Sequence, residues 1–116
     1  MIESSVGTIM ETLETWAREK RSISPQEWLE AASKLNVLLQ GEQERKYVME
    51  SLLAKMKAAY LSEGQTAAYA KSMMEASDEW LDYKKQCALV ERALETIRLA
   101  KGNARLSSEL MRHQLD

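Results

Sequence analysis

Residues that interrupt helices or favour strands are scarce in this chain. Its 116 residues include one proline, four glycines and no phenylalanine. The good helix formers Ala, Leu, Glu, Lys, Met and Arg dominate instead. No stretch shows the sustained alternation of apolar and polar residues that a half-buried strand requires. These absences argue against a β-rich fold and predict an all-α protein.

Histidine and cysteine are almost absent as well. The one cysteine, Cys87, excludes an internal disulfide, and its place among apolar residues predicts a small buried side chain in a reducing compartment. The one histidine, His113, has Glu109 four residues before it, but a metal site needs three or four ligands. No Gly-rich phosphate loop and no Ser/His/Asp set is present. The sequence therefore predicts no metal, no cofactor and no enzymatic activity.

Long apolar runs and a strong charge of one sign are also missing. No run approaches the roughly 18 residues of a membrane span. Residues 1–20 carry acids among their apolar positions, unlike a secretory signal. The formal net charge of −2 gives no general attraction to nucleic acid or to anionic lipid. We expect a single helical domain over residues 1–116, cytoplasmic and without a membrane partner.

Local signals predict where the helices begin and end. We expect helices at about residues 3–20, 25–61 and 67–101, and a short tail helix at 104–114. Ser24 and Glu27 form a capping box around Pro25, which suits a first helical position. Gly64 is the expected C-terminal stop of the second helix, and Thr66 is the expected cap of the next.

Gly41 leaves two readings of residues 25–61 open. The segment forms either one helix or two helices that meet at this glycine. A glycine inside a helix costs only about 1 kcal/mol, and the apolar spacing continues in phase across it, which favours one continuous or kinked helix. The loops between helices are short, so consecutive helices should lie antiparallel. The expected fold is an elongated bundle of three to four antiparallel helices with a long heptad-patterned C-terminal helix.

The C-terminal helix carries a line of large side chains at alternating steps of three and four. We call it the predicted seam; it comprises Trp80, Tyr83, Cys87, Val90, Leu94 and Ile97. Leaving several of these in water would forgo roughly 1.5–3 kcal/mol each, so something must cover them. The cover is another helix of this chain, a second copy or a different protein. Heptads sustained over several repeats favour self-association, as an antiparallel hairpin or a helix-exchanging dimer.

Charge is distributed unevenly along the chain. Residues 1–83 hold 9 basic and 14 acidic residues, net −5, whereas residues 84–116 hold 7 basic and 4 acidic, net +3. Four cations of the second part, which we call the basic stripe, recur at helical spacing: Arg98, Lys101, Arg105 and Arg112. The basic stripe is a solvated face, a contact for the acidic part of a neighbouring copy, or a sequence-blind phosphate contact. The acidic residues Glu75, Asp78, Glu79 and Asp82 are interpreted as a solvated face.

Two segments of the C-terminal half resemble a known group of proteins. "YAKSMMEASDEWLDYKKQ" (69–86) and "ALVERALETIRLAKGNAR" (88–105) loosely resemble small helical accessory proteins of phages and prophages, some encoded near recombination genes. The resemblance rests on the spacing of the aromatics, a Tyr-Lys pair and an Ile-Arg-x-x-Lys step, and it brings no functional residues with it. We predict a helical interaction protein that self-associates and binds a protein partner. The alternative is a nucleic-acid-contacting accessory protein of the recombination or replication type.

Overall fold

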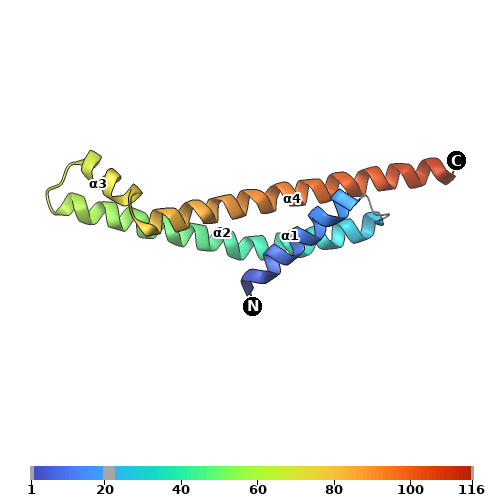
Figure 1. Cartoon of the computed structure of the whole chain (residues 1–116), viewed down its shortest axis with the longest axis horizontal. Coiled ribbons are helices and arrows are strands. Elements are labelled where there is room, and N and C mark those ends of the chain that lie inside the picture. The colour runs from blue at the N-terminus through green and yellow to red at the C-terminus, as the bar shows by residue number, and fades with distance from the viewer. Residues whose placement is uncertain (1, 20–22, 116) are drawn as a thin grey trace. The chain divides into compact units, whose positions relative to one another are not determined.

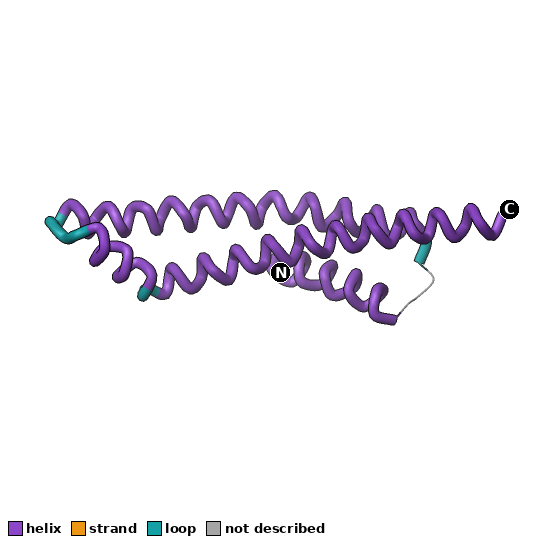
Figure 2. Tube along the Cα trace, turned by 90° about the horizontal axis from the view of Figure 1, so that it is seen from above, coloured by secondary structure: helices purple, strands orange, loops and turns teal. Residues whose placement is uncertain are grey.

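The structure, a computed structural model, describes residues 2–19 and 23–115, with side chains from Val6 to Glu19 and from Ile23 to Arg112. Its helices are α1 (Ile2–Glu19), α2 (Pro25–Ser62), α3 (Ala67–Glu75) and α4 (Asp78–Leu115) (Figure 1). Every regular element in the described residues is a helix (Figure 2), which confirms the all-α prediction. No described helix is long and apolar enough to cross a membrane.

The packing divides the chain into two compact units. The first unit comprises residues 1–40 and 91–116, and the second comprises residues 41–90. The first therefore contains α1, the start of α2 and the C-terminal part of α4. The second contains the rest of α2, all of α3 and the start of α4. Within the second unit α2 and α4 run antiparallel, because Glu42 contacts Gln86 whereas Glu50 contacts Tyr83.

The caps predicted at Ser24 for α2 and at Thr66 for α3 are confirmed. The Glu27 N–H donates to the Ser24 hydroxyl at 3.2 Å, and α2 begins at Pro25. Helix α2 then passes through Gly41 without a break, so the reading of one continuous helix is confirmed. At the start of α3 the Tyr69 N–H donates to the Thr66 hydroxyl at 3.1 Å.

Helix α2 ends at Ser62, two residues before a glycine in the left-handed region. Gly64 has φ +87°, a conformation that side chains with a Cβ rarely adopt. The Gly64 N–H donates to the Leu61 carbonyl and the Gln65 N–H donates to the Tyr60 carbonyl, at 3.1 and 3.2 Å. This pair of bonds is a Schellman motif, which satisfies two of the last carbonyls of the helix.

The C-terminal helices begin at residue 67 as predicted, but the predicted break between them is in the wrong place. Residues 67–101 do not form one helix, because α3 ends at Glu75 and α4 begins at Asp78. Ser77 makes the break stable: its hydroxyl accepts the Trp80 N–H and donates to the Met74 carbonyl. The separate tail helix at 104–114 is also wrong, because α4 continues through Gly102 to Leu115. The free-energy cost of one glycine inside a helix is smaller than the stabilisation that the hydrogen bonds and packing on both sides of it provide.

The first unit has a continuous apolar core contributed by three helices. Its buried apolar residues are Val6, Met10 and Leu13 of α1, Trp28, Ala32, Leu35 and Leu39 of α2, and Ala93, Ile97, Ala100 and Ala104 of α4. The Trp16 and Trp28 rings meet edge to face with centroids 5.3 Å apart. Buried apolar residues are fewer in the second unit, where they are Leu53, Ala70 and Val90.

Candidate interaction surface

The structure separates the members of the predicted seam. Val90 and Ile97 are buried within the chain itself, in the second and first units respectively. Trp80, Tyr83 and Cys87 are half-buried, so the prediction of a buried Cys87 thiol is only partly met. Leu94 is exposed, with 36% of its surface open.

The buried side of α4 in the first unit is offset from the predicted seam. The helix packs through Ala93, Ala100 and Ala104, which we call the alanine face, together with Ile97. The prediction placed Leu94 between Val90 and Ile97, whereas the structure buries Ala93 there. Methyl side chains let neighbouring helix backbones approach closely, so the smallest residues rather than the largest mark this contact.

In the second unit a buried polar pair joins α2 and α4. The buried Gln86 side-chain amide donates to the Glu42 carbonyl at 2.8 Å and to its carboxylate Oε2 at 2.7 Å. Arg45 adds an ion pair to that carboxylate at 3.8 Å. Among the described residues no buried side-chain nitrogen or oxygen lacks a hydrogen-bond partner. The pair therefore joins the two helices without an unsatisfied polar group.

The aromatic part of the predicted seam lies beside this polar pair. The Tyr83 hydroxyl donates to the Glu50 carboxylate at 2.9 Å. Hydrogen bonding to the Cys87 side chain and then to Glu50 raises the pKa of Tyr83 above its ordinary value. The Lys84 ammonium lies 5.0 Å from the centroid of the Trp80 ring. These contacts are made within the second unit and account for most of the half-buried seam residues.

Three leucines of α4 project from the side of the helix that the core leaves free. We call Leu99, Leu106 and Leu110 the leucine stripe; 40%, 57% and 63% of their respective surfaces are exposed. Their spacing of seven and four places them on one side of the helix, about a third of a turn from the alanine face. This apolar surface was not among the site residues predicted from the sequence.

All four residues of the basic stripe are exposed. Arg98 forms an ion pair with Glu95 on the same helix. Lys101, Arg105 and Arg112 form no ion pair with any residue that the structure describes. A different cation, Arg92, ties α4 to α1 through two 3.0 Å hydrogen bonds to the Glu14 carboxylate. Lys101, Arg105 and Arg112 of the basic stripe are therefore available for contacts outside the chain.

The acidic residues predicted to be a solvated face are exposed in the structure. Asp78 and Glu79 lie in the first turn of α4, where negative charge complements the positive end of the helix dipole. Glu75 is 4.0 Å from Lys71, one turn earlier on α3. Helix electrostatics account for Glu75, Asp78 and Glu79 without a ligand.

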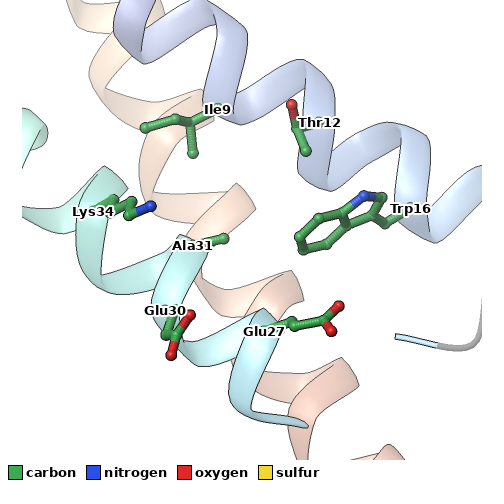
Figure 3. Close-up of a pocket in the computed structure, with 7 residues that line it drawn as sticks. All are labelled: Ile9, Thr12, Trp16, Glu27, Glu30, Ala31 and Lys34. Atoms are coloured by element: carbon green, nitrogen blue, oxygen red, sulfur yellow. The ribbon is translucent and has the colours of Figure 1, made fainter. Parts of the chain in front are cut away.

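A groove lies between α1 and α2 in the first unit. We call it the Trp16 groove; it has a volume of about 270 Å³ and is lined by Ile9, Thr12, Trp16, Glu27, Glu30, Ala31 and Lys34. Figure 3 shows the Trp16 indole and the Glu27 carboxylate at one end, with Lys34 at the other. The small side chain of Ala31 leaves the floor open between Ile9 and Trp16.

The charged rim of the Trp16 groove has few partners inside the chain. The Gln26 side-chain amide donates to Glu30 at 3.2 Å. Within the part of the chain that the structure covers, neither Glu27 nor Glu30 forms an ion pair. Sequence patterns did not reveal this groove, because its walls come from two helices whose relative position only the fold provides.

Comparisons with known proteins return no relative. No protein-family model, no curated protein and no solved structure matches the chain.

Among side chains from Val6 to Glu19 and from Ile23 to Arg112, no three His, Cys, Asp or Glu residues gather in a way that would hold a metal ion. His113 lies outside the described side chains.

Proposed function

We propose that this chain is a non-enzymatic helical interaction protein that self-associates and binds a protein partner. The observation that supports this most directly is the leucine stripe of α4. Its three side chains form a line of exposed apolar surface on a helix whose alanine face already packs in a core. Covering such side chains by another protein is favourable, at up to roughly 1.5–3 kcal/mol for each one that becomes fully buried.

Absolute mass measured by light scattering at several protein concentrations tests the self-association. We expect the mass to rise with protein concentration, because a reversible contact between copies forms more complex as the copies become more concentrated. The double variant Leu106→Ser/Leu110→Ser should shift the rise to higher concentration. A matched control is Val37→Ser/Leu29→Ser, which removes exposed apolar side chains from α2 in the same unit. Equal loss in both variants would mean that the leucine stripe is not the contact.

The unpaired cations of the basic stripe support a second candidate function, contact with nucleic acid. Lys101, Arg105 and Arg112 have the exposure and spacing that phosphate contacts need. Binding of this kind weakens steeply as salt rises, whereas the apolar contact does not. Retention of a labelled duplex that survives the Arg98→Glu/Arg105→Glu substitution would argue against it. The relation to phage accessory proteins stays a prediction.

A further inference from the structure

The leucine stripe is too small to hold two copies together by itself. A stable protein interface buries about 800 Å² on each partner, far more than three leucine side chains present. Self-association therefore needs a second contact. The surface of the first unit offers two features of opposite charge without an ion pair among the described residues: Lys101, Arg105 and Arg112 of the basic stripe, and Glu27 and Glu30 of the Trp16 groove.

The Trp16 end of the groove has the chemistry of a guanidinium site. The Glu27 carboxylate lies beside the indole of Trp16 (Figure 3), and Glu30 follows Glu27 within one helical turn. A carboxylate accepts charge-assisted hydrogen bonds from a guanidinium, and an indole face attracts the same cation. The apolar floor of Ile9 and Ala31 suits the methylene stem of an arginine, which packs well against apolar surface.

Arginines without an internal partner are present in the same chain. Arg105 and Arg112 are exposed and unpaired among the described residues, as is Lys101. Over the described residues none of the three reaches Glu27 or Glu30 of its own copy. Seven residues separate the two arginines, so they lie on one side of α4, about 10 Å apart along the helix.

We propose that the Trp16 groove of one copy takes an arginine of the basic stripe of a second copy. The proposal rests on the self-association proposed above and specifies one of its contacts. Arg105 or Arg112 places its methylene stem over Ala31 and its guanidinium between Trp16 and Glu27. A two-fold dimer can make this contact twice, because each copy carries both surfaces and each stripe can enter the groove of the other copy.

A charge exchange between the two surfaces tests this assignment. The groove variant is Glu27→Lys/Glu30→Lys, and the stripe variant is Arg105→Glu/Arg112→Glu. Each variant alone places like charges opposite each other in the proposed contact. We therefore expect its association constant, measured by sedimentation, to fall roughly tenfold or more below that of the unaltered chain. Mixed at equal concentration, the two variants present opposite charges to each other and should regain association.

Two further variants keep the result interpretable. Glu27 lies in the first turn of α2, so each variant is first shown to keep its helical circular dichroism and melting temperature. Ala31→Leu fills the groove without changing any charge and should weaken association as the groove variant does. Its control, Ala54→Leu, adds the same side chain at an exposed position of α2 in the second unit and should leave association unchanged.

The outcomes separate the inference from the proposed function. If the unaltered chain associates and the groove and stripe variants associate equally well, the inference is wrong while self-association stands. Association lost in both variants and not regained on mixing would also overturn the pairing. A chain that stays monomeric at every concentration would remove the proposed self-association and this contact together.

Discussion

Gln86 donates two hydrogen bonds to a single residue of the facing helix, Glu42, one to its backbone carbonyl and one to its carboxylate. Both residues are buried, in the unit with the smaller apolar core. A polar pair has directional bonds, so it fixes which turn of α2 lies against which turn of α4. Apolar contacts alone would tolerate sliding by one turn more readily.

Removal of the amide should therefore be costly. We expect Gln86→Leu to lower the free energy of unfolding by about 1–3 kcal/mol, because the buried Glu42 carboxylate loses its closest donors. Replacing both partners, as in Glu42→Leu/Gln86→Leu, should recover much of that loss. Urea denaturation measures the unfolding free energies of the single and the double variant, with Gln40→Leu at an exposed position as the control. A double variant that is no more stable than Gln86→Leu would contradict this explanation.

The alanine face of α4 should resist enlargement. Ala100 is fully buried, so Ala100→Leu must push the helices of the first unit apart, and we expect it to cost about 1–3 kcal/mol of unfolding free energy. Ala88→Leu, at an exposed position of the same helix, should have little effect. Thermal or urea unfolding compares the two.

The same helix allows a direct test of which residues face the core. Ile97→Ala should cost about 2–5 kcal/mol, as expected for a buried isoleucine. Leu94→Ala should cost clearly less, because that side chain is 36% exposed. Similar losses of unfolding free energy for the two variants would mean that Leu94 is packed as tightly as Ile97, as the predicted seam requires.

Two glycines should respond to alanine with opposite signs. Gly64→Ala forces a Cβ into the left-handed region and should destabilise by about 1–2 kcal/mol. Gly41→Ala lies inside α2 with no neighbouring atom within 4 Å of the added carbon, so it should stabilise by about 0.5–1 kcal/mol. Urea unfolding midpoints give both values. A loss of stability at Gly41 would indicate that α2 bends there in solution.

Tyr83 should make stability fall in alkaline solution. Folding raises its pKa, so the folded chain holds the phenolic proton more tightly than the unfolded chain, in which the pKa is about 10. The resulting stabilisation is fully present below about pH 10 and is lost as the pH rises from there through the folded-state pKa. Tyr83→Phe should flatten this decline, whereas Tyr47→Phe, at an exposed position, should not. Melting temperatures between pH 8 and pH 11, a range set by the same pKa, measure it.

The beginning and end of α2 could be predicted because local chemistry determines them. Ser24 before Pro25 and the left-handed Gly64 act within a few residues of their own position. The break before α4 was missed although Ser77 precedes two acids, a helix-start signal. Apolar spacing continues in phase across Ala76, a good helix former, and this masked the signal.

The packed side of α4 and the Trp16 groove could not be predicted in the same way. The predicted seam comprises mostly large side chains of the helix. Ala93 and Ala100 are buried instead, because neighbouring helices approach them closely, and that approach depends on tertiary structure. The groove needs Trp16 of one helix and Glu27 of the next to be brought together. No spacing along the chain contains that information.

The three tryptophans give each packing unit its own optical reporter. Trp16 and Trp28 meet edge to face in the first unit, whereas Trp80 lies beside Tyr83 and Lys84 in the second. Emission from a Trp80→Phe variant therefore follows the first unit alone, and emission from a Trp16→Phe/Trp28→Phe variant follows the second. Because α2 and α4 each run unbroken through both units, comparison of the two melting curves shows whether a continuous helix is enough to make them unfold as one.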